Sequence, residues 1–177
     1  MQTIYTVGHS TRTQVELAAI LTPRDIDLVV DIRSIRRSRT NPQFDEARLP
    51  AFLARRSIGY RAIDALGGRR PKAKPPPKHP NDAWEHSAFR NYADYAETAE
   101  FRAGLAELMQ LAAQHTVAIM CSEAVWWRCH RRIVADHLLA HHVRVVHLMS
   151  QRAETLAVAT PFAVIRRGRV HYPAPRR

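Results

Sequence analysis

The sequence lacks any long apolar run, and among its 177 residues it has only two cysteines. A membrane-spanning helix needs about 20 consecutive apolar residues, so we expect no membrane span and no membrane partner. Cys121 and Cys129 are too few for the disulfide framework of a small secreted protein. The chain opens on a strand-like stretch, residues 3–7, rather than on a charged and then apolar leader, which predicts a cytoplasmic protein.

Acidic residues are also scarce. Lys and Arg number 27 against 16 Asp and Glu, which gives a formal net charge of +11. This excess favours an anionic partner, either a small substrate or a nucleic acid. A generally solvated basic surface explains the same charge, because the basic groups at residues 33–39, 69–78 and 166–177 share a face only if the fold brings them together.

Segments with strand character alternate with segments of helical periodicity along most of the chain. Strands are predicted over residues 3–7, 27–32, 58–63, 116–120 and 143–148, and helices from Thr13 and over residues 45–56, 88–97, 98–114 and 127–141. Thr13 and Glu16 form a capping box, and Asp45 is the expected N-cap of the second helix, unless Pro50 delays its start by a turn. We therefore predict one α/β domain over residues 1–177.

The predicted domain has a mostly parallel sheet with helices on both faces and a possible C-terminal hairpin within residues 162–172. One stretch lies outside this plan. Residues 69–80 are almost wholly Pro, Lys and Arg, so residues 69–87 are expected to form a surface loop.

Polar residues gather where the predicted strands end. In an open parallel sheet, ligands bind beyond the carboxyl ends of the strands. The residues placed there are Gly8, His9 and Ser10, then Asp31 and Arg33, then Cys121, Ser122 and Glu123. We expect a pocket at this edge of the sheet.

Cys121 is a candidate nucleophile, because a thiol between a strand and a helix is activated by the helix dipole and by backbone amides. Rhodanese-like and cysteine-dependent phosphatase folds place their nucleophile in this way. The segment departs from them, since Arg128 comes late and Glu123, Trp126 and Trp127 replace a small, glycine-rich cradle. A small buried core residue is the alternative for Cys121.

Metal binding is a second possibility, because Cys121, Cys129, His130 and His9 would supply a tetrahedral set of sulfur and nitrogen ligands. Two features argue against it. Seven residues separate the cysteines, and on a helix that starts near Trp127 the side chains of Cys129 and His130 would point about 100° apart.

A third possibility is acid–base chemistry on a phosphate-bearing substrate. Glu123, Asp31 and His9 would handle protons, with Cys121 as nucleophile or pocket wall. The anion would be bound by Arg33, Arg39, Arg128, Arg131 and Ser10. The competing interpretation is a buried salt-bridge network of Asp31, Arg33, Glu123 and Arg131.

Several motifs together resemble one bacterial and archaeal family, the domain of unknown function 488. They are Thr6-Val7-Gly8-His9-Ser10, Asp31-Ile32-Arg33-Ser34, Ser38-Arg39 with Asn41-Pro42 and Phe44, Leu66-Gly67-Gly68, Tyr92-Ala93-Asp94-Tyr95, Met120-Cys121-Ser122-Glu123 and Cys129-His130-Arg131. The resemblance implies an α/β protein and raises the importance of the residues inside these motifs. It supplies no reaction, cofactor or partner.

The leading hypothesis is a hydrolase or transferase that acts on a nucleotide or nucleic acid in the strand-end pocket. A nucleic-acid-binding module without catalysis is the first alternative, and a metal-binding Cys/His protein is the second.

Overall fold

The computed structural model describes residues 1–77 and 81–174, and a six-stranded sheet forms its centre. The strands are β1 (Thr3–Gly8), β2 (Leu28–Asp31), β3 (Gly59–Ala62), β4 (Val117–Cys121), β5 (Arg144–Leu148) and β6 (Glu154–Leu156). They lie in the order β3-β2-β4-β1-β5-β6, with β1 to β5 parallel and β6 antiparallel at one edge. The predicted mostly parallel sheet is confirmed.

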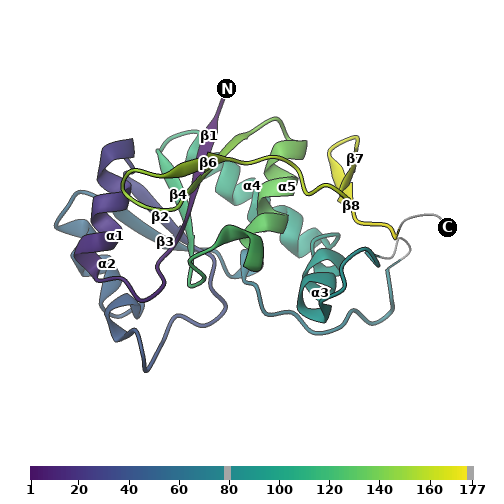
Figure 1. Ribbon diagram of the computed structural model, residues 1–177, viewed down its shortest axis with the longest axis horizontal. Coiled ribbons are helices and arrows are strands. Elements are labelled where there is room, and N and C mark those ends of the chain that lie inside the picture. Colours follow the sequence, from purple (N-terminus) through teal and green to yellow (C-terminus); the bar gives the residue numbers. More distant parts are fainter. Residues whose placement is uncertain (78–80, 175–177) are drawn as a thin grey trace.

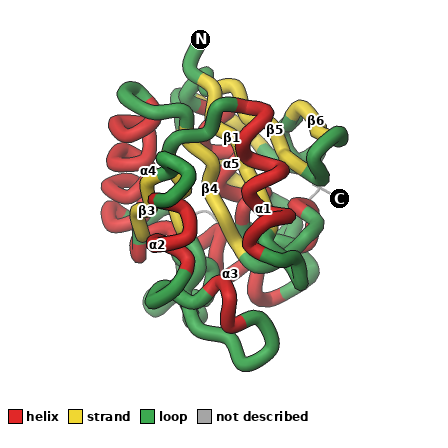
Figure 2. The backbone as a smooth tube through the Cα atoms, turned by 90° about the vertical axis from the view of Figure 1, so that its left-hand side faces the viewer, coloured by secondary structure: helices red, strands yellow, loops and turns green. Residues whose placement is uncertain are grey.

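Helices cover both faces of the sheet, as predicted. They are α1 (Gln14–Leu21), α2 (Leu49–Ala54), α3 (Ser87–Tyr95), α4 (Ala99–Ala112) and α5 (Arg131–Ala140). Helices α1 and α2 lie on one side of the strands and α4 and α5 on the other (Figure 1). Figure 2 looks onto the side that carries α1 and α2. Each side has its own core of buried apolar residues, so β2 and β4 are buried on both faces.

Local sequence signals account for the starts of α1 and α4. The capping box is present, with Thr13 Oγ1 accepting from the amide of Glu16 and the Glu16 carboxylate accepting from the amide of Thr13. Thr98 caps α4 in the same manner, through the amide of Phe101. The predicted C-terminal hairpin is also confirmed, with β7 (Val164–Arg166) and β8 (Arg169–His171) joined by Arg167 and Gly168, both at positive φ.

Two helices begin four residues later than their first predicted positions; for α2 this is the one-turn delay that Pro50 allowed, whereas the predicted start of α5 is wrong. Asp45 does not cap α2; its carboxylate accepts from the amide of Ser38, and α2 begins at Leu49 with Pro50 in its first turn. Helix α5 begins at Arg131 rather than at residue 127. Trp126–Arg128 form a short 3₁₀ turn, and Cys129 after it has an extended backbone.

Edge strand β6 was not predicted. It has three residues, all of them exposed, so no buried apolar run marks it in the sequence. In the segment expected to be a surface loop, residues 69–77 and 81–86 contain no helix or strand, while residues 78–80 lie outside the described part. Within the part of the chain that is described, no helix is long and apolar enough to cross a membrane.

The topology opens a crevice between β2 and β4. These strands are neighbours, but the helices that follow them, α2 and α5, lie on opposite faces of the sheet. Their connecting loops therefore leave the sheet in opposite directions, which separates the loops at the carboxyl ends of the two strands. The register places Asp31 beside Met120, and Gly8 beside Cys121, at this edge.

Candidate functional site

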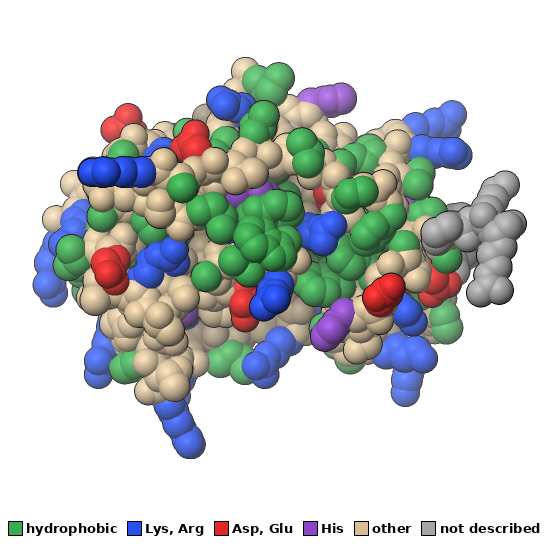
Figure 3. All heavy atoms as spheres, in the orientation of Figure 1, with side chains coloured by type: hydrophobic (Ala, Val, Ile, Leu, Met, Phe, Trp, Pro, Cys, Tyr) green, Lys and Arg blue, Asp and Glu red, His purple; other side chains and the backbone are tan. Residues whose placement is uncertain are grey.

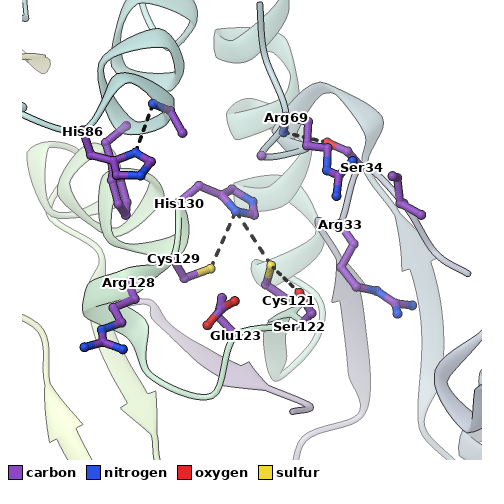
Figure 4. A pocket seen from close by; sticks show the side chains of 14 residues that line it. Arg33, Ser34, Arg69, His86, Cys121, Ser122, Glu123, Arg128, Cys129 and His130 are labelled. Carbon is purple, nitrogen blue, oxygen red and sulfur yellow. Dashed lines mark hydrogen bonds between the residues drawn. The ribbon is translucent and has the colours of Figure 1, made fainter. Parts of the chain in front are cut away.

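A cavity of about 620 Å³ lies where this topology predicts it, beyond the carboxyl ends of β2 and β4 (Figure 4). Its walls come from the loop after β2, the loop after β4, the turn before α5, and the segments at Gly68 and at the start of α3. The lining residues are Arg33, Ser34, Ile35, Gly68, Arg69, His86, Ala88, Phe89, Cys121, Ser122, Glu123, Arg128, Cys129 and His130. Such a volume accommodates a small-molecule ligand.

Cys121, Cys129 and His130 meet in one wall of the cavity. The Nδ1 atom of His130 lies 3.6 Å from the Cys129 sulfur and 3.8 Å from the Cys121 sulfur (Figure 4). The other ring nitrogen, Nε2, donates to the carbonyl oxygen of Ile32 at 3.0 Å. This bond leaves Nδ1 as the nitrogen with a free lone pair, directed at the two thiols.

The pKa values of the two thiols are shifted in opposite directions. The hydrogen bond to Cys129, together with burial, raises the pKa of Cys121 to about 12. Burial also acts to raise the pKa of Cys129, but the hydrogen bond from Cys121 and the charge of Arg131 lower it to about 6. The Nε of Arg131 lies 3.4 Å from the Cys129 sulfur and donates to it. Cys129, not the predicted nucleophile Cys121, is therefore the thiol that ionises more readily.

Asp31 and Arg33 form a buried ion pair beside this cavity. The Arg33 guanidinium donates to the Asp31 carboxylate, with a shortest distance of 2.7 Å, and a second donor, the Tyr60 hydroxyl, lies 2.6 Å from the same carboxylate. Arg33 also donates to the carbonyl oxygen of Phe44. Arg33 contributes to the cavity wall, whereas Asp31 is fully buried and does not line it.

His9 belongs to this network rather than to the cavity lining. Its ring stacks on Phe44, its Nδ1 donates to the carbonyl oxygen of Ser10, and its Nε2 lies 3.2 Å from Arg33 Nη1. Burial lowers the pKa of His9 to about 4, so the ring is neutral at pH 7 and accepts a hydrogen bond from Arg33. The predicted metal set of four residues is thus reduced to Cys121, Cys129 and His130 among the described residues.

Three predicted anion-binding residues, Arg39, Arg131 and Ser10, lie outside the cavity lining. Arg131 is buried, and it donates to Thr6 and to the carbonyl oxygen of Glu123 as well as to Cys129. Arg39 is exposed in the loop after β2, and the amide of Ser10 pairs with the carbonyl oxygen of Ser122. Of the predicted network, Asp31 pairs with Arg33, while Arg131 reaches the backbone of Glu123 rather than its carboxylate.

Exposed charges of both signs line the cavity. Glu123 and Arg128 were predicted site residues, and both line it. The predicted site did not include Arg69, although Arg69 follows the Leu66-Gly67-Gly68 motif directly. Ser34 links the loop after β2 to the segment at Gly68, because its hydroxyl accepts from the amide of Arg69 at 2.9 Å. Within residues 1–77 and 81–174, neither Arg69 nor Arg128 forms an ion pair, so both guanidinium groups are available to an anion.

Fold and site together define an α/β protein with a strand-end pocket that combines thiols, an imidazole, a carboxylate and arginines. The family model described as "Domain of unknown function DUF488" matches residues 14–138, which is most of the chain. The protein belongs to this family. No curated protein and no solved structure matches the chain.

Proposed function

We propose that the protein is an enzyme, a hydrolase or transferase, that acts on a phosphate-bearing substrate in the strand-end cavity. One observation carries the proposal: Arg69 and Arg128, two guanidinium groups without an acidic partner among the described residues, line the same cavity as the Glu123 carboxylate. Guanidinium groups bind phosphate oxygens through paired hydrogen bonds, and a carboxylate provides the proton acceptor that such reactions need.

The assigned roles follow from what each side chain already contacts. Arg69 and Arg128 bind the anion, since their guanidinium groups are exposed and form no ion pair with another described residue. Glu123 is the general base or acid. Arg33 shapes the cavity wall, because its donors are shared among Asp31, Phe44 and His9. Asp31 and His9 support Arg33 from behind the wall.

A nucleotide or a short nucleic-acid segment fits the charge of the cavity, and the net charge of +11 favours its approach. On the face drawn in Figure 3, the Lys and Arg side chains are scattered rather than gathered in one stripe. This distribution favours a local anion site over the alternative, a non-catalytic module that binds nucleic acid along a continuous basic track.

The test measures binding of a nucleoside triphosphate, inorganic phosphate and a short single-stranded oligonucleotide by calorimetry, followed by an assay for phosphate release or transfer. Arg69→Ala and Arg128→Ala are each expected to weaken binding about 10- to 100-fold, as loss of a charged hydrogen bond does. Glu123→Gln should retain binding and lose about 100-fold or more in turnover.

Arg144→Ala is the matched control. Arg144 is exposed at the amino end of β5, whereas the cavity lies beyond the carboxyl ends of the strands. It removes one positive charge without touching the cavity. If Arg144→Ala weakens binding as much as Arg128→Ala, and binding falls steeply with salt, a diffuse nucleic-acid-binding surface replaces the proposed site. Absence of binding by all three probes refutes the proposal.

A further inference from the structure

We infer that Cys121, Cys129 and His130 form a binding site for a zinc-like divalent metal ion, with one coordination position open to the cavity. This inference does not rest on the proposed phosphate chemistry. It starts from three potential ligand atoms, two sulfurs and one ring nitrogen, that lie within 4.8 Å of one another. Two thiolates and an imidazole favour zinc over magnesium or calcium, which bind oxygen ligands.

The spacing of the ligand atoms fits tetrahedral coordination. Bond lengths of about 2.3 Å to sulfur and about 2.0 Å to nitrogen place the two donor atoms about 3.5 Å apart at a tetrahedral angle. The His130 nitrogen lies 3.6 Å and 3.8 Å from the two sulfurs. The two sulfurs lie within 4.8 Å of each other, and two bonds of about 2.3 Å at a tetrahedral angle would hold them about 3.8 Å apart. An ion between the three atoms therefore requires side-chain movements of no more than about 1 Å.

The groups around the ligands also fit a metal site. Metal-binding histidines generally donate their second ring N–H to a carbonyl or carboxylate, and His130 donates to Ile32. The Cys129 sulfur accepts from the backbone amide and from the Nε of Arg131. Such bonds stabilise a thiolate and withdraw charge from it, which leaves a bound cation more electrophilic.

Gly68 leaves room for the His130 ring. A Cβ atom at this position would come nearest to Nδ1, the proposed ligand atom, and would lie 2.8 Å from Cγ and Cε1, closer than packed carbon atoms approach. The glycine therefore allows the chain after β3 to cover the imidazole. This close approach gives Gly68 a role beside the ligand set.

The fourth coordination position faces the cavity. No fourth Cys, His, Asp or Glu joins the group among the described residues, and all three candidate ligands line the cavity. Three protein ligands and one open position are typical of catalytic rather than structural zinc sites. Water bound there would have the Glu123 carboxylate in the same cavity as a proton acceptor.

The two features that argued against a metal site in the sequence do not hold in three dimensions. Cys129 precedes α5 and is not helical, so the two neighbouring ligands are not held 100° apart on a helix. The seven-residue spacing is bridged because the turn Trp126–Arg128 brings the chain back to the end of β4.

Cobalt is the probe of choice, because thiolate–cobalt charge-transfer bands and the visible bands of four-coordinate cobalt report sulfur ligation directly. The 177-residue chain, reduced and stripped with a chelator, is titrated with Co²⁺ and then with Zn²⁺. We expect saturation at a single ion per chain and loss of the bands when zinc displaces cobalt. Added imidazole should shift the visible bands, because it can enter the open position.

Ligand variants locate the site. Cys121→Ser, Cys129→Ser and His130→Ala should each weaken Co²⁺ binding by more than about 100-fold, beyond the effect typical of an outer hydrogen-bonding partner. His86→Ala is the matched control, since His86 lines the same cavity but its Nδ1 accepts from the amide of Ala88. This variant should bind cobalt as the unaltered protein does.

A second measurement needs no variant and so avoids any failure of folding. Zinc should slow alkylation of both thiols in the unaltered, reduced protein. The inference is wrong if the reduced protein binds neither ion, if His130→Ala binds cobalt unchanged, or if the bound cobalt lacks charge-transfer bands. Metal binding without binding of any phosphate probe would sustain this site and refute only the proposed function.

Discussion

The ion pair between Asp31 and Arg33 allows a quantitative test of what burial does to a charge. Asp31→Asn keeps the shape of the side chain and removes its charge. Oδ1 accepts from the amide and the Nε of Arg33, and Oδ2 accepts from Arg33 Nη2, from the Tyr60 hydroxyl and, at 3.2 Å, from the same Nε. In either orientation of the amide, at least two of these four donors face an NH₂ group.

The magnitude follows from those two lost acceptors. A hydrogen bond to a charged group contributes about 1.5–3 kcal/mol, so two of them amount to about 3–6 kcal/mol. Breaking a buried ion pair by removing one partner costs about 3–5 kcal/mol, which agrees. We expect Asp31→Asn to lower the free energy of unfolding by about 3–5 kcal/mol and the melting temperature by about 10 °C, measured by urea and thermal denaturation.

The chain contains a matched control. Arg61 and Glu107 form an ion pair with the same shortest distance, 2.7 Å, but their side chains are 59% and 38% exposed, against 4% and 0% for Arg33 and Asp31. Glu107→Gln should therefore cost no more than about 1 kcal/mol. Equal costs for the two variants would refute the argument from burial. Unchanged stability of Asp31→Asn with loss of turnover would instead make Asp31 a proton-transfer residue.

Two other changes test the packing of the core and of the strand ends. Burial lowers the pKa of His137 to about 3, with His141 and His171 contributing in the same direction, so unfolded chains bind a proton below about pH 6.5 that folded chains do not. Stability should therefore fall by a few kcal/mol as the pH drops from about 6.5 towards 3, and His137→Met should flatten this slope in urea titrations. A slope identical to that of the unaltered protein would contradict the assignment. Gly8→Ala would drive a Cβ into the backbone at Glu123, and we expect a loss above about 3 kcal/mol, seen as a lower melting temperature.

Patterns that repeat along the chain predicted the architecture well. Continuous apolar strands separated by amphipathic helices specify a parallel sheet covered on both faces, and five strands and the hairpin were found where the sequence placed them. The misplaced starts of α2 and α5 have a local cause. Pro50 delays α2 by one turn, as a proline near a helix start indicates, whereas the Trp126–Arg128 turn that delays α5 leaves no signal in the periodicity.

The sequence predicted where the site lies, but it did not predict all of the residues that line it. Strand ends brought Arg33, Cys121 and Glu123 to one edge, as the rule for parallel sheets requires. Arg69 and His86 were missed because they come from the two ends of the segment predicted as a surface loop, and their approach depends on how α3 and α4 pack.

The error at Cys129 shows how a small backbone difference changes the chemistry assigned to a side chain. On a continuous helix from residue 127, Cys129 and His130 would diverge and only one of them could face Cys121. With the helix starting at Arg131, an extended Cys129 turns its sulfur towards Cys121, while the amide of Arg131 donates to that sulfur. The same four-residue shift thus converts two separate cysteines into a pair that shares one histidine nitrogen, which is the arrangement a metal ion requires.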